Sequence, residues 1–249
     1  VSIMKHNNPC GAATAPTLAE ALKKGMAGDP LSAFGSVIGL NRVMDAQTAE
    51  VLAEPGLFIE AIVAPDFEPA ALEILTTKPK WKANVRLLKV GDLDEEPERW
   101  IYRCIEGGVL LQEADVLPDP EDQWKVVTDQ KPTDAQMADL RFAWEIVRHV
   151  KSNAIVLSKE GMLLGTGAGQ MSRVDSTEIA IKKAGDRAQG SVLGSDAFFP
   201  FPDAIDRAAE AGITAIIQPG GSRGDDNVIA ACNKHGLTMV FTARRHFKH

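Results

Sequence analysis

Apolar positions along the chain follow two periods, one typical of buried strands and the other of amphipathic helices. Ile59–Val63 is apolar except at Glu60, as expected of a largely buried strand, whereas Leu18, Leu22 and Met26 recur at the spacing of one helical face. Before residue 91 the pattern predicts strands at Ser2–Lys5, Val37–Leu40, Ile59–Val63 and Val85–Val90, with helices at Leu18–Met26, Ala46–Ala53 and Ala70–Leu75. This alternation predicts an α/β fold with mixed sheets that carry helices on both faces.

The alternation resumes after residues 91–123, an acidic, proline-punctuated stretch with a weak hairpin signal around Tyr102–Gln112. Thr133-Asp134-Ala135-Gln136 resembles a capping box at the start of a helix. Downstream, the pattern predicts strands at Ala154–Leu157, Met162–Gly165, Ile213–Gln218 and Leu237–Phe241, with helices at Ser176–Ala184, Pro202–Ala211 and Asp225–His235. We place a boundary near residues 128–133, which divides the chain into domains 1–130 and 131–249 without an alignable repeat between them.

The composition is that of an ordinary globular protein, with 249 residues, 45% of them hydrophobic, and a net charge of −7. Cys10, Cys104 and Cys232 lie far apart without a C-x-x-C motif, which excludes a disulfide framework and a cysteine zinc knuckle and favours a reducing, cytoplasmic setting. Apolar runs such as Ile213–Ile217 fall far short of the roughly 20 residues that cross a bilayer. Scattered Lys and Arg form no basic stripe, so we expect no membrane and no nucleic acid as a partner.

Lys5-His6-Asn7-Asn8-Pro9-Cys10-Gly11 places a basic pair at the end of the first predicted strand. Neighbours on a regular strand point to opposite faces, so Lys5 and His6 need irregular backbone, which we expect at Asn7-Asn8-Pro9, to enter one pocket. An imidazole titrates near neutral pH and so suits proton abstraction, and an adjacent ammonium stabilises a developing oxyanion. A polar strand end that leads into a turn would explain the same residues without catalysis.

This run resembles the active-site motif of the AICAR formyltransferases, the transformylase half of bifunctional purine biosynthesis enzymes; AICAR is 5-aminoimidazole-4-carboxamide ribonucleotide. Further blocks follow in the order of that family along the whole chain: Ser32–Gly35, Lys151–Ile155, Gly165–Arg173, Ser195–Phe201, Gln218–Ser222 and Arg244–His249. The resemblance implies two cytidine deaminase-like, three-layer α/β subdomains with mixed sheets. It also implies a homodimer whose sites are built from both subunits.

The reaction that the resemblance implies is formyl transfer from 10-formyltetrahydrofolate, the co-substrate, to the 5-amino group of AICAR, a late step of IMP biosynthesis. That amine is a feeble nucleophile, so a base must take its proton while donors stabilise an oxyanion on the formyl carbon. By the resemblance, His6 is the base, Lys5 stabilises the oxyanion, and Asn153 orients His6 or the substrate carboxamide. An Asx turn is the alternative interpretation of Asn153.

The resemblance also implies binding residues. Arg173 would lie near the substrate groups, although a surface arginine that opens a helix explains it equally well. The glycine-rich turn after Gln218 would offer free N–H groups to an anion, although an ordinary turn that needs positive φ accounts for its glycines as well. The full set expected to bind substrates is Phe34, Gly35, Arg173, Phe198 and Phe201 (the base), Asp203 and Ser222 (the folate), Arg245 (the ribonucleotide phosphate) and Phe247.

Several features depart from the family pattern. Pro202 stands where many relatives carry Arg. Ser36 stands where some relatives carry an acid, so at Ser36 we expect the base to be contacted only by the backbone or the hydroxyl group. The chain opens on the apolar run Val1–Met4 without an initiator methionine. We therefore expect the first domain to be truncated at its N-terminus and the phosphate clamp around Arg245 to lack its upstream partners.

Two other interpretations compete with formyl transfer. Zinc-dependent deamination needs H-x-E and P-C-x-x-C, and neither motif occurs, so we expect no zinc. A non-catalytic nucleotide-binding, folate-binding or dimerisation fragment would keep the aromatic residues but gain nothing from the pair Lys5-His6. The cyclohydrolase activity of the bifunctional enzymes resides in an N-terminal domain to which nothing in this chain corresponds, so we assign none here.

Overall fold

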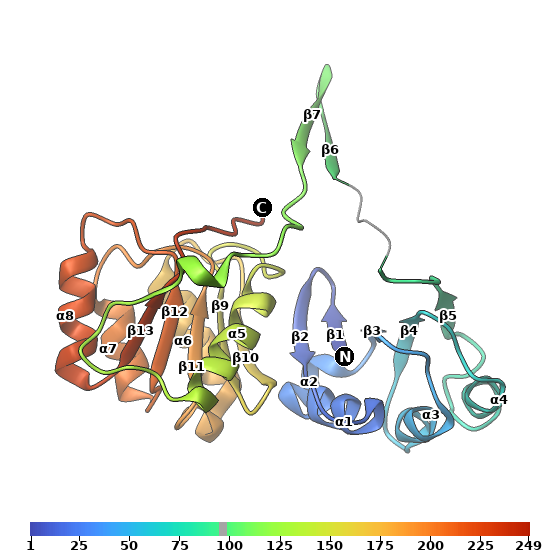
Figure 1. The fold of residues 1–249 in the computed structure, drawn as a ribbon. Coiled ribbons are helices and arrows are strands. Elements are labelled where there is room, and N and C mark those ends of the chain that lie inside the picture. Colours follow the sequence, from blue (N-terminus) through green and yellow to red (C-terminus); the bar gives the residue numbers. More distant parts are fainter. Residues whose placement is uncertain (95–98) are drawn as a thin grey trace.

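The structure, a computed structural model, describes residues 1–94 and 99–249 as two mixed sheets with helices and a separate two-stranded arm (Figure 1). The α/β class with mixed sheets predicted from the sequence is confirmed. The first sheet has the order β2-β1-β3-β4-β5 and the second β10-β9-β11-β12-β13-β8. Their edges meet where β2 and β10 lie side by side, through a bridge between Ala13 and Met162.

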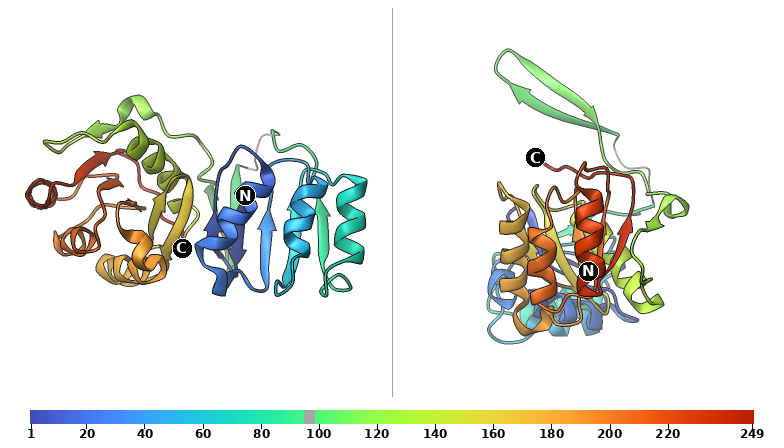
Figure 2. Two further views of the ribbon diagram at one scale, coloured as in Figure 1. Left: turned by 90° about the horizontal axis from the view of Figure 1, so that it is seen from below. Right: turned by 90° about the vertical axis from the view of Figure 1, so that its left-hand side faces the viewer.

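The first sheet combines an antiparallel hairpin with parallel strands. Its strands are β1 (Ser2–Lys5), β2 (Asn8–Ala12), β3 (Ser36–Gly39), β4 (Ile59–Ala64) and β5 (Arg86–Lys89). β1 runs antiparallel to β2 and β3, and β3, β4 and β5 are parallel. The helices of this half are α1 (Leu18–Gly28), α2 (Pro30–Ala33), α3 (Ala46–Ala53) and α4 (Pro69–Thr77). α1, α3 and α4 cover one face of the sheet (Figure 2).

The second sheet repeats this topology. Its strands are β8 (Lys125–Val126), β9 (Ile155–Lys159), β10 (Met162–Gly167), β11 (Val192–Ser195), β12 (Ala215–Gln218) and β13 (Thr238–Phe241). The α-helices are α5 (Asp134–Val147), α6 (Arg173–Ala184), α7 (Asp203–Glu210) and α8 (Asp225–His235), with 3-10 turns η1 (Glu121–Gln123) and η2 (Gly185–Ala188). Again a hairpin, β9-β10, is followed by an antiparallel strand and two parallel ones.

The repeated topology could not be detected by comparing the two halves of the sequence. Two sheets with the same topology need buried strands in the same order, but their side chains can differ. The second half has one further layer. α5 packs on β9, β11 and β12, on the face opposite α6, α7 and α8. In the first half, the described residues place no helix on the face opposite α1, α3 and α4, so the expectation of helices on both faces is met by the second sheet and not by the first.

The arm consists of β6 (Trp100–Ile105) and β7 (Gly108–Glu113), an antiparallel pair that stands away from both sheets (Figure 1). Every residue of both strands is exposed. Its exposed large apolar side chains are Trp100, Ile101, Tyr102, Ile105, Val109, Leu110 and Leu111. A lone two-stranded hairpin is marginally stable in water, so this arm lacks the packing that an independent sheet needs.

Most element positions agree with the sequence pattern, and α3 and α8 agree at both ends. The sequence did not predict β2, β8, β11 or α2, because such short elements carry little periodicity, and β2, β11 and α2 also contain Gly or Pro. α6 begins at Arg173, three residues before the predicted start at Ser176, since Ser172 caps it by accepting from the Asp175 N–H. β8 precedes the predicted boundary near residues 128–133 and pairs with β13 of the second sheet.

The capping box predicted at Thr133 is present. Thr133 Oγ1 accepts from the Gln136 N–H at 3.2 Å, and Gln136 Oε1 accepts from the Thr133 N–H at 2.8 Å. Thr133→Ala removes one half of the box and should lower the free energy of unfolding in urea by about 1 kcal/mol. Thr76→Ala, the same change on an exposed α4 side chain that caps nothing, should have an effect below about 0.5 kcal/mol. Equal losses at the two positions would contradict a capping role.

Candidate functional site

The basic pair lies at the tip of the β1-β2 hairpin. Lys5 pairs with Asn8 across the strands, so His6 and Asn7 form a two-residue loop in which His6 is exposed with φ +54°. Such loops need positive φ, which places the irregular backbone at His6-Asn7. Asn8 and Pro9 belong to β2, but the register shifts between the pairs Ile3–Gly11 and Met4–Pro9, so the irregular backbone expected at Asn7-Asn8-Pro9 is present as the loop and as a break in register beside Pro9.

Lys5 is held against the turn before β3. Its Nζ donates to the backbone oxygens of Phe34 at 2.6 Å and Gly35 at 3.2 Å. Gly35 has φ +70°, and a Cβ there would lie 3.1 Å from the same Nζ. Phe34 is 57% exposed and packs on Phe58 with 5.5 Å between ring centroids. Three predicted site residues, Lys5, Phe34 and Gly35, are thus in contact.

Two polar side chains near Lys5, Cys10 and Ser36, are poorly placed to take part in catalysis or binding. Burial, followed by the charge of Asp29, raises the pKa of Cys10 to about 11, so this thiol stays protonated and is a poor nucleophile. Ser36, which follows Gly35, is fully buried, and its hydroxyl has no hydrogen-bond partner in the described part of the chain.

A second group of site residues surrounds a buried ion pair at the start of α6. Arg173 Nη1 lies 2.5 Å from Asp196 Oδ1, and Arg173 Nη2 donates to Asn153 Oδ1 at 2.8 Å. Asn153 Nδ2 donates in turn to the backbone oxygens of Gln170 and Met171. We call Asn153, Arg173 and Asp196 the Asn–Arg–Asp cluster. Neither an Asx turn nor a surface arginine describes this arrangement, since both side chains have long-range partners and the Arg173 side chain is 9% exposed.

An aromatic pocket adjoins this cluster. Asn153, Arg173, Phe198, Phe201 and Asp203 line a cavity of about 300 Å³, together with Pro200 and the backbone before α6. The Arg245 guanidinium lies over the Phe198 ring, 4.7 Å from its centroid. A half-buried Phe198 and an exposed Phe201 present flat apolar surface beside polar groups, which suits a planar heterocycle.

Arg245 also borders a second cavity of about 570 Å³ at the glycine-rich turn after β12. In this turn, the N–H groups of Gly221 and Ser222 donate to the Asp225 carboxylate at 2.7 and 3.2 Å. The Ser222 hydroxyl accepts from the Gly224 N–H. The expectation of free N–H groups for an anion is therefore wrong, because Asp225 of α8 already occupies two of them. Phe247 is half exposed and stacks on His249.

The predicted residues thus form two groups within one chain. Lys5, His6, Phe34 and Gly35 belong to the first half, and the aromatic pocket, the cluster and Arg245 belong to the second. The hairpin tip approaches the second group through Asn8, whose Oδ1 accepts from the Lys151 N–H at 2.9 Å. No hydrogen bond or ion pair in the described ranges joins Lys5 or His6 to Asn153.

Sequence reasoning missed Asp196 as a site residue. It lies within the block Ser195–Phe201, is fully buried, and accepts from Arg173, from the Ala154 N–H at 3.2 Å and from Ser152. The sequence feature that could have identified Asp196 is its position directly after a buried strand and before a run of apolar residues. An aspartate in such a position is expected to be buried, and a buried carboxylate needs polar or charged partners.

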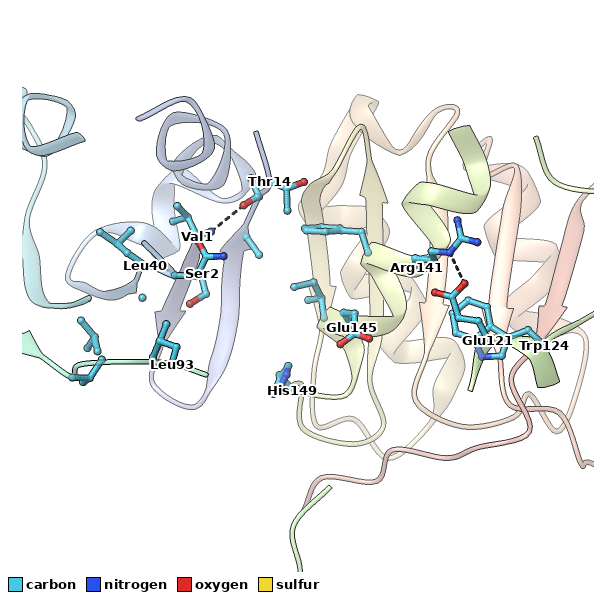
Figure 3. A pocket seen from close by; sticks show the side chains of 18 residues that line it. Val1, Ser2, Thr14, Leu40, Leu93, Glu121, Trp124, Arg141, Glu145 and His149 are labelled. Carbon is cyan, nitrogen blue, oxygen red and sulfur yellow. Dashed lines mark hydrogen bonds and ion pairs between the residues drawn. The ribbon is translucent and has the colours of Figure 1, made fainter. Parts of the chain in front are cut away.

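A larger cavity of about 820 Å³ lies away from all these residues, between the first sheet and α5 (Figure 3). Val1, Leu40 and Leu93 line one side, and Arg141 and His149 line the other (Figure 3). None of the predicted site residues contributes to it. Among the described residues there is no group of three metal-binding side chains and no helix long and apolar enough to span a membrane.

The fold and the site define an α/β protein in which a buried polar cluster and an aromatic wall lie at the carboxyl end of a mixed sheet. Residues 1–183 match the family described as the AICARFT/IMPCHase bienzyme, and the chain belongs to this family. It is 65% identical to the bifunctional purine biosynthesis protein PurH of Rhodopirellula baltica, over 100% of this chain and 48% of the relative. It is 52% identical to PurH of Synechococcus elongatus (100% of this chain, 47% of the relative) and 51% identical to PurH of Persephonella marina (99% and 47%).

The chain therefore spans about half the length of these relatives. Among solved structures, a dCMP deaminase from the cyanophage S-TIM5 aligns with 44% of this chain and 98% of its own, at 19% identity and a TM-score of 0.30.

Proposed function

We propose that this chain transfers the formyl group of 10-formyltetrahydrofolate to the 5-amino group of AICAR and so acts in purine biosynthesis. The observation that carries the proposal is the pair Lys5-His6, displayed at a hairpin tip in a chain of the AICARFT/IMPCHase family. In the sequence alone this pair could be a polar strand end. In the structure His6 is exposed to a ligand while Lys5 is anchored by two carbonyls, which is how a base beside a fixed cation would be arranged.

His6 takes the proton from the attacking amine as a bond forms between the amine nitrogen and the formyl carbon. The ammonium of Lys5 stabilises the negative charge that this places on the formyl oxygen. When the tetrahedral intermediate collapses, the bond from the formyl carbon to the folate nitrogen breaks, and protonated His6 returns its proton to that nitrogen. The products are formyl-AICAR and tetrahydrofolate.

The second group of residues binds the substrates in this proposal. Phe198 and Phe201 pack on the flat imidazole ring of AICAR, and the Arg245 guanidinium group makes bidentate hydrogen bonds to the ribonucleotide phosphate. Gln170, Met171 and Arg173 fix the orientation of the Asn153 amide, whose Oδ1 can still accept one hydrogen bond from the substrate carboxamide. Asp203, Ser222 and Phe247 contact the folate.

A second copy of the chain completes the site. The apolar side chains of the arm are exposed, which leaves a lone hairpin marginally stable. Among the described residues, no hydrogen bond or ion pair joins Lys5 or His6 to Asn153. We therefore propose a cytoplasmic homodimer in which the arm packs on the partner. Sedimentation of the wild type and of Leu110→Glu, a charge on the arm, should give a dimer and a monomer respectively.

The direct test is spectrophotometric detection of tetrahydrofolate released from 10-formyltetrahydrofolate and AICAR. PurH of Rhodopirellula baltica serves as the positive control. Release by this chain supports formyl transfer. If the control is active and this chain releases no tetrahydrofolate, the result favours the other candidate function, a non-catalytic binding or dimerisation fragment. That candidate function gives no reason for the presence of Lys5-His6.

Lys5→Met should lower kcat by about 10²–10³ with the KM for AICAR changed less than about threefold, because the ammonium acts on charge that exists only in the transition state. Lys24→Met is a matched control: its Nζ also donates to two backbone oxygens, those of Glu160 at 2.6 Å and Thr14 at 3.4 Å, far from the site. Steady-state kinetics should show the loss only in the first variant. A rise in KM alone would make Lys5 a binding residue.

A further inference from the structure

The C-terminal segment 244–249 is fastened by a buried histidine. His246 is 1% exposed, and its ring packs on Trp144 with 4.9 Å between centroids. Nδ1 makes a short contact with Asp115 Oδ2, and Nε2 lies 2.7 Å from Asp119 Oδ2. Both aspartates belong to the stretch of chain that leads out of the arm. His246 thus joins the end of the chain to the base of the arm.

The two contacts define which protons the ring carries. An ionised carboxylate only accepts hydrogen bonds, whereas a neutral imidazole has one donor and one acceptor nitrogen. Burial by itself would raise the pKa of Asp119, but hydrogen bonds from Arg244, Trp144 and His246 hold this pKa below its usual value. Asp119 is therefore ionised at neutral pH. A carboxylate oxygen lies beside each ring nitrogen, so both nitrogens are placed to donate, which is the hydrogen-bonding pattern of an imidazolium.

Each of the two aspartates also has a cationic partner besides the His246 ring. Arg148 of the turn after α5 lies 3.2 Å from Asp115 and 3.8 Å from Glu145, and Arg244 lies 2.8 Å from Asp119. Asp115 and Asp119 are thus each shared between the His246 ring and one guanidinium group. Burial, then the charges of Lys248 and Arg148, lower the pKa of the nearby His149, so that ring is neutral.

The same segment reaches the Asn–Arg–Asp cluster. The His246 N–H donates to the Asp196 backbone oxygen at 2.9 Å. The Ser152 N–H donates to the Lys248 oxygen at 2.9 Å, the Lys248 N–H donates to Ser152 Oγ at 3.2 Å, and Ser152 Oγ donates to the Asp196 carboxylate. A continuous chain of contacts therefore runs from the arm through His246 to the residues that orient Asn153 and Arg173.

We propose that His246 is a positioning residue: held as an imidazolium between Asp115 and Asp119, it fixes Arg245 relative to both the arm and the Asn–Arg–Asp cluster. Its neighbour Arg245 is carried on the same segment, over Phe198. Only the consequence for AICAR binding rests on the proposed function. The protonation of the ring and its coupling to the arm do not.

The protonation state can be measured directly on this chain. In long-range ¹H–¹⁵N spectra at pH 7.5, both ring nitrogens of His246 should carry protons, with the signals assigned by their absence in His246→Gln. A His246 ring with one unprotonated nitrogen at pH 7.5 would overturn the proposal.

Hydrogen exchange tests the coupling. In His246→Gln, amides of 114–119, 150–154 and 244–249 should exchange about tenfold faster, because the hydrogen bonds that join these segments open more often. Asp115→Asn is a second variant for the case in which His246→Gln does not fold. The Asp115 side chain is half exposed and Asn has the same shape, so this variant should fold. It should raise the exchange rates of the same three segments. His235→Gln, at the surface pair His235–Asp206, is the matched control and should change none of them. Faster exchange confined to 244–249 would refute the link.

Kinetics tests the consequence. Asp115→Asn should raise the KM for AICAR about tenfold and leave kcat within about threefold, since it displaces a binding group and not the base. An unchanged KM together with loosened segments would refute the positioning of Arg245. An inactive wild type would count against formyl transfer alone, because the ring protons and the exchange rates still decide the role of His246.

Discussion

His6→Asn should lower kcat for tetrahydrofolate release by about 10²–10⁴, the usual contribution of a general base. Asn cannot take the proton from the amine, yet it tolerates the left-handed conformation that His6 adopts at φ +54°. The hairpin tip should therefore keep its shape, and thermal unfolding should move little. His6→Ala should lose the same activity with a slightly less stable turn, because Ala disfavours positive φ.

The matched control is His235→Asn, which changes the same side chain on α8, where His235 pairs with Asp206. It should keep the wild-type rate. The dependence of kcat on pH gives a second readout, because an acidic limb that disappears in His6→Asn identifies His6 as the group that titrates. A rate within twofold of wild type in both His6 variants would remove this residue from the mechanism.

Asp196→Ala should lower the free energy of unfolding by about 3–5 kcal/mol, the usual effect of removing one partner from a buried ion pair. Arg173 would keep its guanidinium in a site that is 9% exposed on the side chain, with only the neutral Asn153 and Ser195 as partners. The Ala154 N–H and the Ser152 hydroxyl would also lose their acceptor. Chemical denaturation in urea measures this loss.

Asp206→Ala removes a carboxylate from a pair whose aspartate is half exposed and should change stability by at most about 1 kcal/mol. Asp196→Asn keeps the size and one acceptor oxygen, so its loss should fall between the two. If Asp196→Ala were as mild as Asp206→Ala, the Asn–Arg–Asp cluster would not hold the start of α6, and Asp196 would not be the group that anchors Arg173.

The helices were predictable where polar and apolar residues alternate over two turns or more. α3 and α8 begin and end at the predicted residues, and the Thr133 box marks the start of α5. β2 and β11 were not predictable, since each has few residues and contains glycine. Their assignment comes from ladder partners that lie elsewhere in the chain, such as β1 for β2 and β9 for β11.

The candidate site was predictable as a set of residues but not as an arrangement. Lys5 and His6 follow from their motif, and so do Phe198 and Phe201. The motif does not tell that Asp196 neutralises Arg173, nor that Asp225 occupies the N–H groups of the glycine-rich turn. Asp196 lies 23 residues from Arg173, so their contact depends on the tertiary fold. Asp225 lies only 4 and 3 residues from Gly221 and Ser222, and that contact depends on the conformation of the turn.

The sequence by itself determined the α/β class, most helices, the family resemblance and the residues that carry candidate chemistry, because periodicity and motif order are local properties of the chain. Only the tertiary structure decided that two sheets share one topology, that the arm stands exposed, and that His246 is enclosed by Asp115 and Asp119. The physical reason is that burial, charge pairing and proton placement depend on which distant residues meet, and a buried imidazole differs from an exposed one only in its neighbours.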